Sequence, residues 1–159
     1  NEKSLSLPAI TINITMYTGL QHAHSYIAFA ALILLIVASI NAIIGMSSNK
    51  EFKDGDRKLS LFALIFTHIQ LLIGIVLYFV SPMVQTFKLP MGEVMKNADL
   101  RLYAIEHPLI NIIAVVLITI GWSRHKKMAT SKAKFKSIAI MFALGTILIL
   151  SRIPWSTWL

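Results

Sequence analysis

Histidine is the residue type in this sequence that offers the most chemistry, and it occurs five times, as His22, His24, His68, His107 and His125. An imidazole can bind a metal ion, exchange a proton near neutral pH or form hydrogen bonds between helices. The first four histidines lie inside strongly apolar runs or at their starts, where an ionisable residue is costly and by default indicates a functional site. His125 lies among basic residues, and we expect it to be a solvated loop residue.

The composition is that of an integral membrane protein. Of the 159 residues, 56% are hydrophobic and 14% are charged, and the mean hydropathy is +0.70, far from a soluble domain. A net charge of +8 fits basic loops beside a membrane better than a nucleic-acid interface. Because cysteine is absent, disulfides, iron–sulfur clusters and thiolate metal sites are excluded. The sequence contains no hydrolase triad and no phosphate-binding glycine loop.

Four apolar runs must position the histidines. They cover residues 19 to 46, 59 to 81, 102 to 122 and 135 to 153, each close to or above the roughly 20 residues that cross about 30 Å of hydrocarbon. We predict an all-α polytopic membrane protein, an up-down-up-down four-helix transmembrane bundle over residues 16 to 159. The first run is long for one crossing, so we expect it to tilt or to extend past the bilayer. Residues 1 to 15 are interpreted as an outward arm or a non-native leader.

The distribution of charge predicts the orientation of the bundle. Segments 47 to 58 and 123 to 134 carry most of the lysines and arginines, whereas the longer segment 82 to 101 mixes bases with acids. Short basic loops favour the cytoplasmic side of a membrane. We therefore predict that both basic loops are cytoplasmic and that both chain termini face outward.

His24 and His107 are the leading candidates for iron ligands. Each lies about five residues into its helix, roughly 8 Å from the outward end. The first and third helices run in the same direction and face each other diagonally in an up-down bundle, so the two imidazoles could ligate a haem between them. Small residues on the same faces, such as Ala28, Ala31 and Ala114, could leave room for the macrocycle. An alternative is that small residues only allow close helix packing and that the histidines bridge helices by hydrogen bonds.

The remaining histidines fit this site less well. His22 is two residues from His24 and points about 200° away on a helix, so it is a reserve ligand. His68 lies near the middle of the membrane, on a polar side of the second helix that must face protein. A second haem between His68 and Met141 is conceivable, and a hydrogen bond from His68 to a neighbouring helix is the alternative. The polar side of the second helix also includes Thr67, Gln70, Gly74 and Tyr78.

Charged residues accompany the histidines at the outward end. Glu106 precedes His107 and points about 100° away on a helix. It could orient a histidine N–H or carry a proton, or it could simply be an acid at the positive end of a helix that begins with Pro108. Arg101 and Arg152 could pair with Glu106 or with haem propionates. Arg152 could also snorkel to an interface where Trp155 and Trp158 act as anchors.

Four stretches carry a family resemblance: "MYTGLQHAHSY", "RKLSLFALIFTHIQLLIGIVLYFVSP", "LRLYAIEHPLINIIAVVLITIGWSRHKK" and "SRIPW". Over residues 16 to 155 the chain resembles the small four-helix membrane proteins of flavobacteria and relatives that are labelled cytochrome B. The resemblance implies a b-type haem, electron transfer and a bacterial inner membrane. The histidines at matching positions are His22, His24, His68 and His107, and residues 1 to 15 have no counterpart.

The sequence and this resemblance lead to one main expectation and two alternatives. We expect a haem b protein that transfers single electrons, with a quinone or a larger respiratory complex as partner, rather than a stand-alone enzyme. One alternative is a haem-free accessory subunit of a larger membrane complex. The other is a small proton or solute pathway that uses Glu106 and His68.

Overall fold

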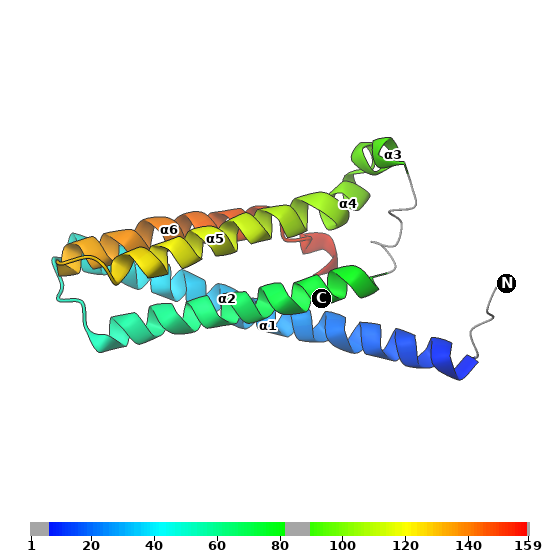
Figure 1. The fold of residues 1–159 in the computed structure, drawn as a ribbon, viewed down its shortest axis with the longest axis horizontal. Helices are drawn as coiled ribbons and strands as arrows, with labels where there is room; N and C mark the ends of the chain where they lie inside the picture. The colour runs from blue at the N-terminus through cyan, green and yellow to red at the C-terminus, as the bar shows by residue number, and fades with distance from the viewer. Residues whose placement is uncertain (1–6, 82–89, 159) are drawn as a thin grey trace.

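The computed structural model describes the backbone of residues 7–81 and 90–158, and every regular element within those ranges is helical. Figure 1 shows the arrangement of these elements. In chain order they are α1 (Leu7–Ser47), α2 (Asp54–Val80), α3 (Met91–Lys96), α4 (Ala98–Arg101), the π-helical turn η2 (Leu102–Glu106), α5 (His107–His125), α6 (Ser131–Ser151) and the 3-10 turn η3 (Trp155–Thr157).

Four helical segments are long and apolar enough to cross a membrane, which confirms the predicted all-α polytopic bundle. They are Thr15–Ser47, Asp54–Val80, Ala98–His125 and Ser131–Ser151. The helices extend beyond the predicted apolar runs because hydropathy detects the apolar middle of a helix, whereas polar first and last turns are still helical. The first helix is long, as expected, and the backbone of residues 7–15 continues it. Residues 1–6 of the expected arm lie outside the described part.

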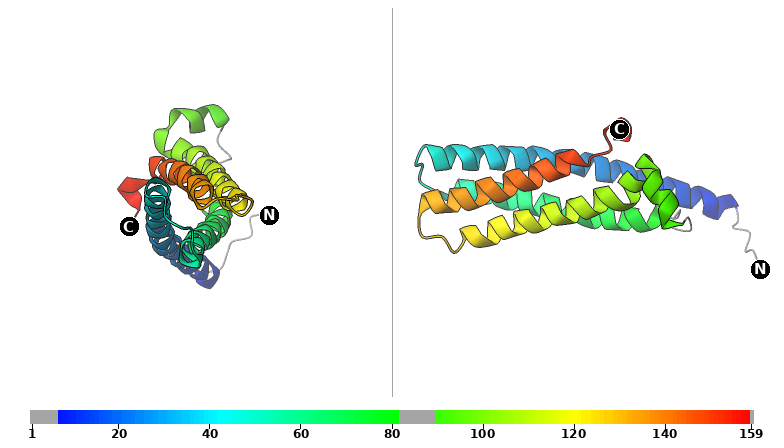
Figure 2. Two further views of the ribbon diagram at one scale, coloured as in Figure 1. Left: turned by 90° about the vertical axis from the view of Figure 1, so that its left-hand side faces the viewer. Right: turned by 90° about the horizontal axis from the view of Figure 1, so that it is seen from above.

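The helices pack in the predicted cyclic order. α1 packs against α2 and α6, and α5 packs against α6 and, less extensively, against α2. The end-on view in Figure 2 shows the four helices around a common centre. α1 and α5 therefore lie across the diagonal of the bundle, as the predicted topology requires.

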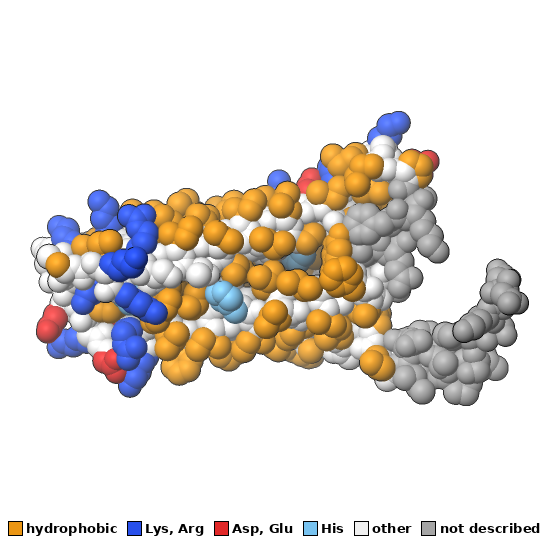
Figure 3. Space-filling view, viewed as in Figure 1, with side chains coloured by type: hydrophobic (Ala, Val, Ile, Leu, Met, Phe, Trp, Pro, Cys, Tyr) orange, Lys and Arg blue, Asp and Glu red, His pale blue; other side chains and the backbone are white. Residues whose placement is uncertain are grey.

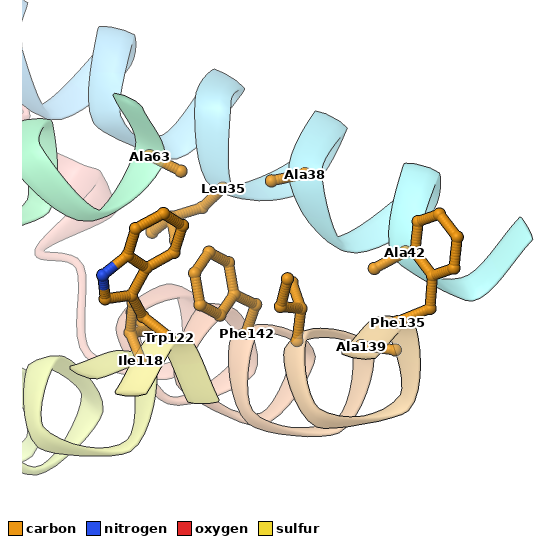
Figure 4. Close-up of a cluster of buried hydrophobic side chains, with 10 residues drawn as sticks. Leu35, Ala38, Ala42, Ala63, Ile118, Trp122, Phe135, Ala139 and Phe142 are labelled. Atoms are coloured by element: carbon orange, nitrogen blue, oxygen red, sulfur yellow. The ribbon is translucent and has the colours of Figure 1, made fainter. Parts of the chain in front are cut away.

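The packed core lies in the half of the bundle that contains the two short loops. Phe135 and Phe142 of α6 point toward α1, where they belong to one buried cluster with Leu35, Ala38 and Ala42 (Figure 4). Both phenylalanine rings are fully buried. A small residue allows this packing: a Cβ built on Gly45 would lie 2.5 Å from the Phe135 ring, so the ring occupies the space that a side chain at Gly45 would fill.

Large apolar side chains cover the outside of the bundle. Figure 3 shows them along its length. In water such a surface would be an aggregation liability, and in a bilayer it faces lipid tails. Exposed examples occur on all four long helices and include Ile33, Phe62, Phe79, Val116 and Ile147.

Most lysines and arginines in this view gather at one end of the molecule, which we call the basic end (Figure 3). The α1–α2 and α5–α6 loops lie there (Figure 1). Asp56, which is 6% exposed, connects the first loop to both flanking helices. Its carboxylate accepts hydrogen bonds from Asn41 Nδ2 (2.9 Å), Lys50 Nζ (2.7 Å) and the Lys53 backbone N–H (3.0 Å).

Replacing Asp56 with alanine is expected to lower the free energy of unfolding by about 2–3 kcal/mol, because three donors lose a buried charged acceptor. Detergent-solubilised protein titrated with sodium dodecyl sulfate and followed by circular dichroism measures the change. Asp54→Ala is the matched control, since the Asp54 carboxylate is exposed and pairs with Arg57 and Lys58 at the surface. Equal loss of stability in the two variants would contradict the role assigned to Asp56.

The expectation that His125 is a solvated loop residue is wrong. α5 continues three residues past the predicted end at 122, so His125 occupies its last turn and is only 2% exposed. Its Nδ1–H donates to the Trp122 carbonyl, and the rings of Trp122 and Phe52 pack on it. The basic neighbours that suggested a loop, such as Arg124 and Lys126, are exposed while His125 points inward.

Candidate functional site

The structure brings His24 of α1 and His107 of α5 together across the bundle diagonal. Their ring centroids are 6.3 Å apart and the ring planes make an angle of 68°. Both side chains are partly buried. Two imidazoles from diagonally opposed helices thus face a common space near the end of the bundle opposite the basic loops.

Backbone and side-chain contacts fix the orientation of His107. Its Nδ1–H donates to the carbonyl oxygen of Arg152 at 2.7 Å, in the turn where α6 ends. Asn111 Nδ2 donates to the His107 carbonyl at 2.6 Å. Because Nδ1 carries the proton, Nε2 keeps its lone pair. Metal-ligating histidines typically have this arrangement, in which one ring nitrogen donates to a carbonyl and the other is free to bind.

The turn that precedes His107 is unusual. Residues Leu102–Glu106 form a π-helical turn between α4 and α5. Such turns are rare and occur frequently at functional sites. The wider turn changes the angle between successive side chains, so the angle of about 100° expected between Glu106 and His107 in a regular helix does not apply.

α2 contributes a cradle for His24. The side-chain nitrogen of Gln70 lies 3.1 Å from both ring nitrogens of His24. An atom equidistant from the two nitrogens is not aligned with the in-plane lone pair of either, so the contact is not a strong hydrogen bond. One turn further, a Cβ on Gly74 would lie 3.1 Å from His24 Cε1. The absence of a side chain at Gly74 therefore leaves room for the His24 ring.

Gln70 also carries an unsatisfied acceptor. Its Oε1 is buried and has no hydrogen-bond partner among the described residues. The oxygen and nitrogen of a side-chain amide exchange places on a 180° turn, which would bring Oε1 against the His24 ring. Sequence reasoning placed Gln70 on the polar side of its helix but did not pair it with His24, because that contact depends on how α2 is rotated.

A charged group lies beside His107. Glu106 accepts from Arg101 Nε at 2.7 Å and pairs with Arg152 Nε at 3.3 Å. Both expected partners of Glu106 are therefore present. Two guanidinium groups paired with one carboxylate carry a net charge of one positive unit. The backbone carbonyl of Arg152 also accepts the hydrogen bond from His107, so this charged cluster is connected to the histidine.

His22 does not join the pair. Its side chain is exposed and stacks on Tyr26 with a centroid separation of 6.4 Å. It thus points to another side of α1 than His24, as the spacing of two residues requires.

His68 hydrogen-bonds between helices instead. Its Nδ1–H donates to the Leu64 carbonyl at 2.8 Å, and its Nε2 lies 3.3 Å from Thr119 Oγ1 on α5. Met141 packs against the opposite side of α5, because a Cβ on Gly121 would lie 2.6 Å from the Met141 Cβ. Residues 119 and 121 point about 200° apart on a helix, so α5 separates His68 from Met141. The structure therefore gives no support to a second haem between them.

The spacing of His24 and His107 suits two ligands of one metal ion. A metal–nitrogen bond is about 2 Å long and a ligating nitrogen lies about 1.1 Å from its ring centre, so opposed imidazoles have ring centres roughly 6 Å apart. Within the ranges that the structure describes, no three histidine, aspartate or glutamate side chains gather into a metal site. A bare ion would thus lack ligands, whereas a haem supplies four nitrogens of its own and needs two axial ones.

The charges around the pair are also compatible with a haem, because guanidinium groups form strong charge-assisted hydrogen bonds with carboxylates such as propionates. Arg101 and Arg152 lie next to the histidine site and are partly exposed. The two imidazoles, their spacing and the two neighbouring guanidinium groups could therefore hold a haem. In comparisons with known proteins, no family model, no curated protein and no solved structure matches this chain.

Proposed function

We propose that this membrane protein binds one haem b between His24 and His107 and transfers single electrons. The observation that carries the proposal is the pair of imidazoles on diagonal helices, with ring centres 6.3 Å apart. The haem, when bound, supplies the one-electron chemistry, and the protein supplies its position and electrostatic surroundings.

The residues around the two ligands have separate tasks. The Arg152 carbonyl accepts a hydrogen bond from Nδ1–H of His107, so Nε2 would be the nitrogen that binds the iron, and this hydrogen bond would raise the basicity of the ligand. Gln70 would offer a corresponding acceptor to His24: with the amide turned and the His24 ring rotated to align one N–H with it, the buried Oε1 would accept the proton of the ring nitrogen that does not bind. Both ligands would then have a fixed tautomer.

Arg101 and Arg152 would hold the haem propionates. Glu106 bridges the two guanidinium groups and keeps them at the edge of the site, and charge-assisted hydrogen bonds to a carboxylate are the stronger kind. The same end of the bundle is the one where water is near, so the propionates would stay hydrated.

Localisation and partners are part of the proposal. The basic loops favour the cytoplasmic side of a bacterial inner membrane, which puts the haem near the outward face. A quinone or a larger respiratory complex is the partner class that a single-electron carrier at this depth would serve. Glu106 and His68 interact with different residues of the bundle, and no observation favours a proton or solute pathway through them.

A reduced-minus-oxidised absorbance spectrum tests the proposal. Protein purified from haem-replete cells is reduced with dithionite and reoxidised with ferricyanide. We expect a sharp difference band of a bis-histidine b-type haem that appears and disappears reversibly. A flat trace from such cells would refute haem binding, and co-purification of other subunits without pigment would support an accessory subunit instead.

A further inference from the structure

A cavity of about 370 Å³ opens at the basic end of the bundle, remote in the fold from the histidine pair. Four cationic side chains line it with a single carboxylate, that of Asp54. The cations come from two loops that are far apart in sequence: Lys53 and Arg57 from the start of α2, and Lys126 and Lys134 from either side of the α5–α6 loop. The proposed electron transfer uses none of them.

The two loops are attached to each other, so the cavity is preformed. The Phe52 backbone N–H donates to Ser131 Oγ at 3.0 Å. The Phe52 ring contacts Phe135 at a centroid separation of 4.9 Å and His125 at 5.6 Å. Because Phe135 and His125 are buried, the floor of the cavity belongs to the packed core.

Two of the cations are available to a ligand. Arg57 is already paired with Asp54 at 2.7 Å, and Lys53 with Glu51 at 3.8 Å. Lys126 Nζ lies 5.0 Å from the centre of the Trp122 ring and Lys134 Nζ 5.8 Å from that of Phe52, and across the described ranges neither lysine forms an ion pair with a carboxylate. Aromatic faces position an ammonium group but leave its charge uncompensated and its N–H donors open.

The position of the cavity indicates which class of ligand can reach it. The second membrane-spanning segment begins at Asp54 and the third ends at His125, and both residues line the cavity. It thus lies at the level where phospholipid headgroups meet the spans. Basic pockets between transmembrane helices at this level suit phosphate-bearing headgroups. We propose that the cavity binds the headgroup of an anionic phospholipid, with Lys126 and Lys134 on its phosphate.

Titration of the delipidated protein in detergent with phosphatidylglycerol, followed by native mass spectrometry, tests the proposal. The double variant Lys126→Gln/Lys134→Gln is expected to bind phosphatidylglycerol about 30-fold more weakly, which is about 2 kcal/mol. The matched control is Lys127→Gln/Lys132→Gln, which removes the same charge from the same end of the bundle but outside the cavity. We expect it to bind within about twofold of the unmodified chain, because exposed charges away from the site are screened.

Three outcomes would overturn the proposal. Equal weakening in the two double variants would show non-specific attraction to the basic surface. Equal affinity of the unmodified chain for phosphatidylcholine would show that the lysines do not select charge. If inorganic phosphate raised the thermal unfolding temperature of the protein as much as phosphatidylglycerol does, the occupant would be a soluble anion. Folding of each variant is checked by circular dichroism, and Lys126→Gln alone, at an exposed position, repeats the test with an expected loss of about fivefold.

Discussion

Replacing either His24 or His107 with alanine is expected to abolish the haem absorbance of the purified protein. Each imidazole would supply one of the two axial nitrogens, and the described residues offer no third candidate in the same space. Removing a residue that only hydrogen-bonds to a metal ligand lowers metal affinity about 10–100-fold. Removing the ligand itself should cost more, so we expect haem affinity to fall by at least about 100-fold. The haem absorbance per chain after purification measures the effect.

His22→Ala is the matched control for this experiment. His22 is on the same helix as His24 but is exposed and stacks on Tyr26, so we expect full haem content in the variant. His68→Ala should also keep the haem, since His68 bonds to Thr119. Retention of haem in His107→Ala, or its loss only in His68→Ala, would refute the ligand assignment.

Gly145→Val is expected to lower the free energy of unfolding by overpacking the contact between α5 and α6. A Cβ at this position would lie 2.6 Å from Ile118 Cγ1 and 3.1 Å from the Ala114 carbonyl oxygen. The Ile118 side chain would have to move, and because the Ala114 carbonyl belongs to the backbone of α5, α5 and α6 would also have to shift apart slightly. Overpacking of this kind costs about 1–3 kcal/mol, and the close backbone contact places Gly145→Val at the upper end. Titration with sodium dodecyl sulfate followed by circular dichroism measures the cost.

Gly55→Ala serves as the control for the glycine experiment. Nothing lies within 4 Å of a Cβ at Gly55, and alanine is the better helix former, so we expect unchanged or slightly higher stability. If Gly145→Val were as stable as Gly55→Ala, the close α5–α6 packing seen here would be wrong.

The fold could be predicted from the sequence because its signals are strong and local. Apolar runs of membrane-spanning length indicated the four helices, and short loops implied an antiparallel cyclic order. Counting residues along two helices that run in the same direction then put His24 and His107 at one depth. The structure places their rings 6.3 Å apart, so simple helix geometry was sufficient for the pairing.

The surroundings of the pair could not be predicted because they depend on how helices are rotated and how chains turn. Gln70 reaches His24 only for one rotation of α2 about its axis. The Arg152 carbonyl reaches His107 because α6 ends there and the chain bends. His125 was misassigned for a related reason. The basic composition around it indicated a loop, but the residue belongs to the last turn of α5, where its side chain is buried while its basic neighbours are exposed.

The haem-to-chain ratio of the unmodified protein tests the central proposal most directly. Haem is quantified as its pyridine haemochrome and the chain by amino-acid analysis, both on protein purified from haem-replete cells. One histidine pair across the bundle leads us to expect one haem per chain. A ratio of zero would contradict haem binding, and a ratio of two would require a second site that the separation of His68 from Met141 by α5 does not provide.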